Sequence, residues 1–234
     1  DGQLMRTFKV VLGLGNAWYE ADALFAWSPL DDTDTSAMNP RIGNVIPLIE
    51  GPGPTKEADG LWNFGGVNRF GTTNAFSGQM KLNKPALWAS VMDIVVPSGY
   101  YKMLWKHGAG NFMSTYVQET NTEVLAYSYI GGGSPAPAFK PGALTGKHVL
   151  WIYYDPATKL LHTGMDQIPN GSVVREWVGA GFNNRLYVGG PEGANPMAAS
   201  VMKHGAMQFI NRASMSLADV LGIVKKMQDH HNIP

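Results

Sequence analysis

Short runs of alternating apolar and polar residues, separated by glycine, proline and asparagine, fill most of this chain. A period of two residues indicates β-strands, because successive side chains of a strand point to opposite faces of its sheet. The clearest case predicts a hairpin, with strands at 148–154 and 159–165 joined by the turn at 155–158. The chain is therefore expected to be largely β.

Similar runs predict the remaining strands, and the turn residues between them favour antiparallel neighbours. These strands span residues 7–12, 23–27, 61–64, 86–96, 100–106, 112–118, 123–130, 173–178, 185–188 and 201–211. Residues 31–60 are rich in Asp, Thr, Pro and Gly and are interpreted as a long irregular excursion.

Helical spacing is found only near the end of the sequence. Leu217, Val220, Leu221 and Val224 fall on one helical face, and Ser216 can cap the first turn. The pattern predicts a helix of about three turns over 216–227. Because strands do not alternate with long helices, the sequence favours an all-β fold with one C-terminal helix over a parallel α/β sheet.

The length of 234 residues suits one large β-domain, since sandwiches commonly exceed 200 residues without dividing. Residues 1–21 are expected to form an N-terminal strand and extension, and residues 22–234 the sandwich. The chain starts at Asp1 rather than Met, so the true N-terminus is open: a signal, a leader or a neighbouring domain before it is compatible with the sequence.

The charge balance and the lack of cysteine limit the classes of binding partner and of chemical site that the chain can have. Eighteen basic residues balance eighteen acidic ones, so no overall field favours nucleic acid or an anionic membrane surface. No run approaches the roughly 18 apolar residues of a membrane span, and we expect no membrane insertion. Cysteine is absent, which excludes disulfides, thiolate metal sites and cysteine nucleophiles.

Four segments resemble the concanavalin A-like superfamily, in particular its laminin G-like lectin branch. They are Leu24–Asp32, Gly146–Asp155, Leu186–Gly190 and Gly205–Ser216, which are similar to that family's first, central, penultimate and closing strands. Lys147 and Gln208 depart from the family pattern, where Trp and an acidic residue are usual. The resemblance implies a jelly-roll sandwich of two antiparallel sheets that binds ligands on a concave face or on rim loops.

Aromatic residues are the candidate ligand contacts, because sugars stack their C–H surfaces on aromatic faces. Tyr101, Trp105, Tyr127, Tyr129 and Trp151 lie on predicted strands and are the proposed binding residues. Packing in the core is the alternative for each of them, since most aromatic residues of a sandwich are buried.

Acidic residues offer two further candidates. Asp31, Asp32 and Asp34 alternate in a loop whose oxygens suit Ca²⁺, against the alternative of a solvated acidic loop. We expect the protein to need no cofactor. Glu20 and Asp22 have the two-residue spacing of glycosidase acids on one strand but lack a third acid, so we expect no enzyme activity.

Three functional hypotheses follow. The first is a non-catalytic binding module of an extracellular or virion surface protein, whose partner is a glycan or cell-surface polysaccharide. The second is a structural subunit of a phage particle, such as a tail, fibre or decoration protein, which contacts other virion subunits or forms a homo-oligomer. The third is a divergent glycoside hydrolase or polysaccharide lyase, because the fold also hosts such enzymes.

Overall fold

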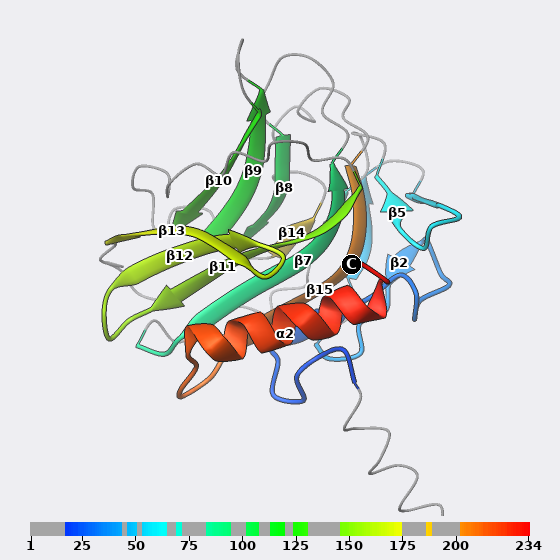
Figure 1. Ribbon diagram of the computed structural model, residues 1–234. Helices are drawn as coiled ribbons and strands as arrows, with labels where there is room; N and C mark the ends of the chain where they lie inside the picture. Colours follow the sequence, from blue (N-terminus) through cyan, green and yellow to red (C-terminus); the bar gives the residue numbers. More distant parts are fainter. Residues whose placement is uncertain are drawn as a thin grey trace, which may run out of the picture.

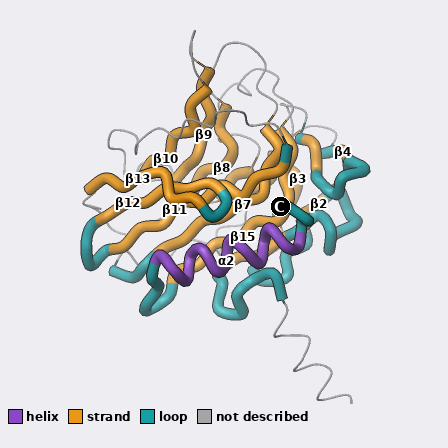
Figure 2. Tube along the Cα trace, viewed as in Figure 1, coloured by secondary structure: helices purple, strands orange, loops and turns teal. Residues whose placement is uncertain are grey.

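The computed structural model describes residues 17–43, 46–50, 53–64, 69–71, 83–94, 102–107, 113–119, 124–130, 146–174, 186–188 and 202–234. In this part of the chain, strands dominate and one helix lies near the C-terminus (Figure 2). No helix in these segments has the length and apolarity that a membrane crossing needs.

The strands form two antiparallel sheets, one behind the other, with helix α2 (Leu217–His230) in front (Figure 1). An eight-stranded sheet has the order β13-β12-β11-β7-β15-β5-β4, and β1 pairs with β15 beside this path. Its strands are β1 (Phe25–Trp27), β4 (Thr55–Lys56), β5 (Trp62–Asn63), β7 (Ala86–Ile94), β11 (Lys147–Asp155), β12 (Leu160–Met165), β13 (Ile168–Val174) and β15 (Met202–Asn211).

The second sheet has seven strands in the order β10-β9-β8-β14-β6-β3-β2. Its strands are β2 (Ala37–Met38), β3 (Ile46–Glu50), β6 (Arg69–Gly71), β8 (Lys102–His107), β9 (Met113–Glu119), β10 (Val124–Ile130) and β14 (Leu186–Val188). Since β14 lies between β6 and β8, segments distant in sequence meet in the middle of this sheet.

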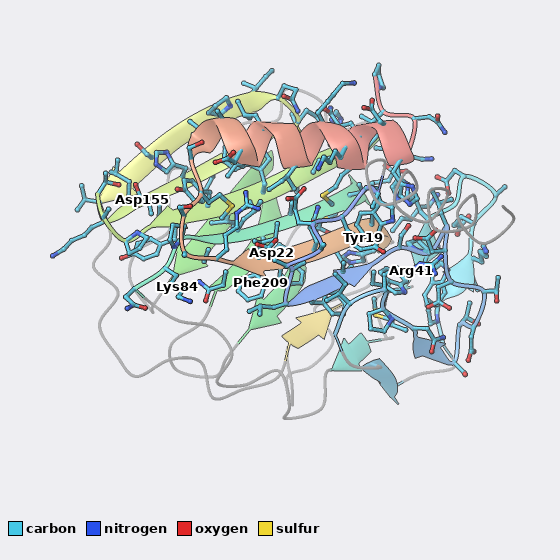
Figure 3. The ribbon with its side chains drawn as sticks, turned by 90° about the horizontal axis from the view of Figure 1, so that it is seen from below. Tyr19, Asp22, Arg41, Lys84, Asp155 and Phe209 are labelled. Atoms are coloured by element: carbon cyan, nitrogen blue, oxygen red, sulfur yellow. The ribbon has the colours of Figure 1, made fainter. Side chains whose placement is uncertain are left out.

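The outer face of the eight-stranded sheet is covered by α2, as the view from below shows (Figure 3). Leu87, Ala89 and Val91 of β7 belong to the same buried cluster as Val220 and Met227 of the helix. Each buried aliphatic side chain of this size contributes about 1.5–3 kcal/mol to folding. The helix is therefore held by its apolar face, as its sequence periodicity predicts.

The opposite side chains of the same strands form a second buried layer. Trp88 and Met92 of β7 alternate with the helix-facing residues, and each is 1% exposed. Phe209 of β15 packs its ring against Trp88, and Phe25 of β1 stacks on the same indole. The eight-stranded sheet is thus apolar on both faces, which explains why β7 lacks clean alternation of apolar and polar residues.

The all-β prediction with one C-terminal helix is confirmed, and so is the hairpin, now β11 and β12. The strand predicted at 173–178 begins earlier, as β13, because a strand at the end of the sheet order tolerates Pro169 and Gly171. The predicted irregular excursion at 31–60 contains the short strands β2, β3 and β4. The predicted strand at 7–12 lies outside the described residues.

The boundary predicted at residue 22 stays a prediction. Trp18, on the N-terminal side of it, is 7% exposed and belongs to the buried cluster beneath α2. Tyr19 is partly buried against the same cluster, toward the C-terminal end of the helix (Figure 3). Trp18 and Tyr19 therefore contribute to the buried cluster between α2 and the sheet.

Candidate functional site

The candidate aromatic residues fall mainly on the seven-stranded sheet. Trp105 lies on β8, and Tyr127 and Tyr129 lie on β10. On β9, Tyr116 lies opposite Tyr127, and Ser114, two residues away, lies opposite Tyr129. Because positions two apart on a strand share a face, Tyr116, Tyr127 and Tyr129 are positions on one face of the sheet. This face is the candidate ligand surface. Tyr101 lies outside the described residues.

Position Trp105 belongs to the opposite face of the same sheet from Tyr127 and Tyr129. It pairs with Thr115, the residue between those opposite Tyr127 and Tyr129, because the register shifts between Met103 and Trp105. An irregularity of this kind changes which positions share a face. Sequence alternation alone therefore could not place Trp105 relative to the two tyrosines.

Trp151 has a packing role in this structure. It is 2% exposed, and its indole Nε1 donates a 3.0 Å hydrogen bond to the backbone oxygen of Asp166. The indole lies over Gly164, its partner on β12, where any Cβ would approach the ring within 1.9 Å. Its ring offers no exposed face for stacking, and this burial argues against a ligand contact at Trp151.

The predicted calcium loop is organised by its own hydrogen bonds. Asp32 is 4% exposed, and its Oδ2 accepts from Trp27 Nε1 at 2.8 Å and from the Asn39 backbone at 2.7 Å. Its Oδ1 accepts from the Asp34 backbone and from Asn39 Nδ2, both at 3.1 Å. Four protein donors therefore occupy the carboxylate that was expected to bind the cation.

The two neighbouring aspartates have separate partners. Asp31 Oδ2 accepts from Trp18 Nε1 at 2.9 Å and lies 3.4 Å from Arg41 Nε, whereas Asp34 Oδ1 accepts from the backbone and hydroxyl of Ser36. Within the described part of the chain, no three acidic or histidine residues come together as a metal site. Calcium binding by this loop stays a prediction that the geometry does not support.

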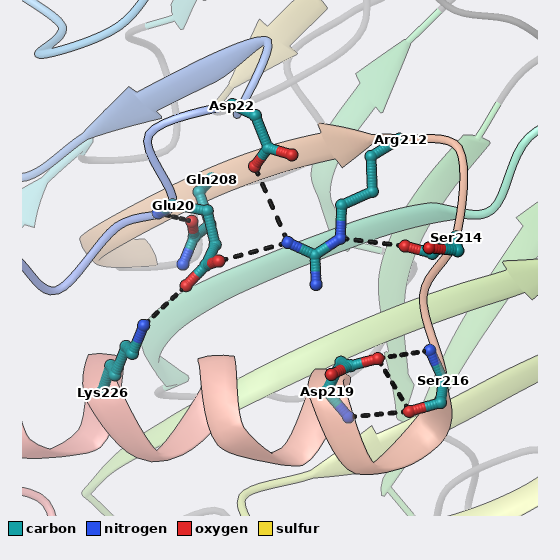
Figure 4. Close-up of polar contacts among 8 residues, drawn as sticks. All are labelled: Glu20, Asp22, Gln208, Arg212, Ser214, Ser216, Asp219 and Lys226. Atoms are coloured by element: carbon teal, nitrogen blue, oxygen red, sulfur yellow. Dashed lines mark hydrogen bonds and ion pairs between the residues drawn. The ribbon is translucent and has the colours of Figure 1, made fainter.

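The acids at Glu20 and Asp22 meet a common cation rather than a cleft (Figure 4). Arg212 Nη1 lies 3.2 Å from Glu20 Oε2 and 3.7 Å from Asp22 Oδ1. The other oxygen of Glu20 accepts from Lys226 Nζ of α2 at 2.7 Å. Gln208 Oε1 accepts from the Glu20 backbone at 3.1 Å. The cluster joins the N-terminal segment to β15 and to the helix.

Electrostatics make Glu20 a poor proton donor. Burial raises its pKa, but the hydrogen bonds and charges of Lys226 and Arg212 outweigh burial, and the net pKa lies below the ordinary value of 4.5. A glycosidase general acid needs a raised pKa so that it is protonated near neutral pH. The pair therefore stabilises the fold and lacks the electrostatics of a catalytic dyad.

Two histidine contacts were not visible in the sequence. His148 Nδ1 lies 2.7 Å from Asp166 Oδ2, which ties the start of β11 to the turn after β12. His230 Nε2 lies 2.9 Å from Ser28 Oγ, 202 residues away in the chain. Ser28 is 1% exposed and its hydroxyl also accepts from the Leu30 backbone, so it serves the fold rather than a reaction.

Two further histidines are buried and uncharged. His204 of β15 is fully buried with its ring edge against Phe64, and neither ring nitrogen has a hydrogen-bond partner. His231 is 2% exposed, and its Nε2 accepts from the Ala206 backbone at 2.8 Å. Burial lowers the pKa of both side chains to about 3. For His231, the charges of His230 and Lys147 add to this effect.

No protein-family model matches the chain, and no curated protein matches it. Solved structures do share its fold. Trypanosoma rangeli sialidase in complex with sialic acid matches with a TM-score of 0.65 and 12% identity, over 92% of this chain and 34% of the sialidase. The binding domain of botulinum neurotoxin DC in complex with SialylT matches with a TM-score of 0.64 and 8% identity, over 89% of this chain and 52% of that domain.

The receptor binding domain of the botulinum neurotoxin C/D mosaic serotype gives a similar result, with a TM-score of 0.64, 6% identity, and coverage of 87% of this chain and 51% of that domain. This chain therefore spans about a third of the sialidase and about half of the toxin domains. At such low identity, the likeness concerns the all-β fold alone.

Proposed function

We propose that this chain is a non-catalytic glycan-binding module. The observation that carries the proposal is the fold shared with a toxin binding domain in complex with SialylT and with a sialidase in complex with sialic acid. The ligand surface is the face of β9 and β10 that carries positions Tyr116, Tyr127 and Tyr129. Tyrosine suits this role, because it offers an aromatic face and a hydroxyl group together.

The proposal includes membership of the laminin G-like branch of concanavalin A-like sandwiches. The four segments that resemble this family contain β1, β11, β14 and residues 205–211 of β15. Of these, β1 pairs with β15, and β11 joins β15 through β7. The resembling segments thus supply neighbouring strands of the larger sheet and the central β14 of the smaller one.

The absence of catalysis is part of the proposal. The pairing of Glu20 with Arg212 and Lys226 supports it, because the carboxylate stays ionised. We expect no hydrolysis of a fluorogenic sialoside or of a polysaccharide panel by the purified protein. Turnover that Glu20→Gln abolishes would contradict the proposal and favour a divergent glycosidase.

Independence from calcium is proposed as well. The carboxylate of Asp32 already accepts from Trp27, Asn39 and Asp34. We expect chelation to leave both the melting midpoint and glycan affinity unchanged. A midpoint that falls on chelation and recovers with Ca²⁺ would identify a site, since a ligand that binds the native state raises stability.

Binding is tested with a glycan array, followed by calorimetry with sialyllactose and a neutral oligosaccharide of equal length. Tyr127→Ala and Tyr129→Ala should each weaken the best array hit by about tenfold or more, the effect of losing one stacking contact. Trp151→Phe is the matched control: it alters a buried aromatic residue and should leave affinity unchanged. Equal affinity for the wild type and both tyrosine variants would contradict the proposed surface.

The same preparation separates this function from an assembly role. An extracellular or virion surface location suits either function. A stable trimer on sizing, together with no array signal, would favour a phage tail, fibre or decoration subunit. A monomer that binds glycan favours the module.

A further inference from the structure

The C-terminal end of α2 is fastened to the sandwich by His230 and His231, which we call the histidine latch. His231 Nε2 accepts the Ala206 backbone N–H at 2.8 Å. The His230 ring stacks on Trp18 at a centroid distance of 5.1 Å, and its Nε2 lies 2.9 Å from Ser28 Oγ. Both histidines thus bind segments far from them in the sequence.

The partner of His231 is produced by an irregularity in β15. The pairing of β15 with β7 shifts register between His204 and Met207, which lies around Ala206. A bulge of this kind leaves one residue outside the ladder of the sheet. The Ala206 N–H is buried there, and His231 supplies its acceptor. Without that acceptor, the buried amide would have no hydrogen-bond partner, which would lower the stability of the fold.

The acceptor role fixes the protonation state of His231. A ring nitrogen accepts a hydrogen bond only when it carries no proton, so Nε2 must be bare while the latch is closed. A proton on Nε2 would face the Ala206 N–H with a second donor. His230 is less constrained, because the Ser28 hydroxyl can donate or accept. His231 is therefore the acid-sensitive member of the latch.

The charges that face the latch oppose protonation of His231 on balance. Lys147, at the start of β11, and His230 of the helix lower its pKa, whereas Asp31 and Asp59 raise it more weakly. Burial lowers the pKa of His230, and of the charges around it Asp31 raises that pKa and Arg41 lowers it. No acidic side chain hydrogen-bonds the His231 ring among the contacts of the described residues.

From this geometry we infer that the histidine latch opens in acid and releases the C-terminal end of α2 from the eight-stranded sheet. Protonation of His231 removes the bond to Ala206 and places a charge between the helix and the sheet. The released end uncovers apolar residues beneath it, including Leu61 and Val91, which are 0% exposed in the closed state. The module thereby gains an acid-triggered apolar surface.

The size of the effect follows from linkage. In the open state His231 takes the ordinary pKa of about 6.5, whereas in the closed state its pKa is about 3. Stability of the closed state is therefore complete above pH 6.5 and falls as the pH decreases toward 3. Between pH 7 and pH 5, the ratio of open to closed molecules should rise about 20-fold.

Hydrogen exchange at pH 7 and pH 5, corrected for the intrinsic pH dependence of exchange, tests this inference. In the wild type, protection of the Ala206 amide and of residues 224–230 should fall about 20-fold at pH 5, while β7 remains better protected than the helix end. His231→Gln keeps an acceptor that does not titrate, so its protection should be nearly equal at the two pH values. His204→Leu removes the second buried histidine among the described residues and should behave like the wild type at the helix.

Three results would overturn the inference: equal loss of protection in His231→Gln and wild type, no loss in the wild type, or a helix end that is as well protected as β7 at pH 5. If His231→Gln fails to fold, wild-type histidine titration by NMR replaces it. A His231 ring that takes up its proton near pH 6.5, with no change in the Ala206 amide signal, would also overturn it.

Discussion

The two ends of helix α2 are fastened by different chemistry. At its start, Ser216 and Asp219 form a capping box, in which the Asp219 backbone donates to the Ser216 hydroxyl at 3.2 Å and the Ser216 backbone donates to the Asp219 carboxylate at 2.7 Å (Figure 4). At its end, His231 accepts from Ala206. The first set is exposed and local, whereas the second is buried and joins distant segments.

Because of this difference, the two ends of the helix keep their hydrogen bonds over different pH ranges. Hydrogen bonds from the Ser216 backbone and hydroxyl hold the pKa of Asp219 below its ordinary value, so the start of the helix keeps its cap to low pH. The end depends on an imidazole that must stay uncharged. A single helix can therefore stay anchored at one end while the other end responds to mild acid.

The largest expected effect is the loss of overall stability in acid. The pKa of His204 and of His231 is about 3 in the native state and about 6.5 in the unfolded chain, so the unfolded chain binds more protons between these values. From pH 7 to pH 5, the free energy of unfolding should fall by about 2 kcal/mol for each histidine. Urea titrations at the two pH values measure it.

His204→Leu and His231→Gln should each remove about 2 kcal/mol of that pH dependence, and the double variant most of it, while His162 and His230, whose pKa values burial also lowers, keep a smaller part. Because the two rings belong to different contacts, their contributions should add. A wild type with equal unfolding free energies at pH 7 and pH 5 would refute the assignment of these histidines as neutral groups.

Truncation beneath the end of the helix should be nearly as costly. Met227 is 0% exposed in the cluster between α2 and the sheet, and Met227→Ala should lower the free energy of unfolding by about 3 kcal/mol at pH 7. Leu221→Ala is the comparison, since Leu221 is only partly buried against the cluster and should cost less. An equal cost for both variants would mean that burial does not set the energetics of this helix.

Glu20→Gln should have a smaller effect, of about 1–2 kcal/mol at pH 7. It removes a partly buried carboxylate that contacts Arg212 and Lys226. Since the native pKa of Glu20 is lowered, its contribution is present above pH 4.5 and is lost as the pH falls further. Thermal unfolding at pH 7 and pH 3.5 should show a difference from wild type that shrinks in acid.

Asp22→Asn is the control for that experiment. Asp22 is 55% exposed and 3.7 Å from Arg212, so its removal should change stability by less than Glu20→Gln. The ranking would be wrong if Asp22→Asn destabilised the protein as much as Glu20→Gln.

The smallest effect is expected at the helix start. Ser216→Ala removes the cap and should cost about 1 kcal/mol, independent of pH between 5 and 8. Denaturant unfolding across that range measures it, with Ser214→Ala as the control, because only the backbone oxygen of Ser214 has a partner here, Arg212. A cost that varied with pH in this range would break the contrast between the two ends.

The sequence predicts features that depend on neighbouring residues. Ser216 before an apolar stripe marks the helix start, and the turn at 155–158 marks the hairpin, because both signals lie within a few residues of the structure that they specify. The sequence predicts the helix end at Met227, three residues before His230, because the apolar stripe ends there. The last turn is held by a contact to β15, which the sequence does not reveal.

The features that could not be predicted are contacts between distant segments. His231 and Ala206 meet only once β15 bulges, and Ser28 meets His230 across 202 residues. For the aspartates of the acidic loop the sequence leaves two interpretations open, because the pattern that suits calcium also suits hydrogen bonds to nearby backbone N–H groups, as at Asp32. The packing of Trp151 could not be predicted either, because only the pairing of β11 with β12 places its ring over Gly164.

The glycine at the bulge of β15 has a consequence for finding relatives of this protein. A Cβ at Gly205 would come within 3 Å of Val91, Leu61 and the His231 ring, so position 205 can change only if the three elements around it change as well. Gly205 and His231, the histidine just beyond the helix, therefore belong to one packing arrangement and should be kept or lost together. Searches that score this pair together with the strand order should recognise kin whose overall sequences have diverged past ordinary comparison.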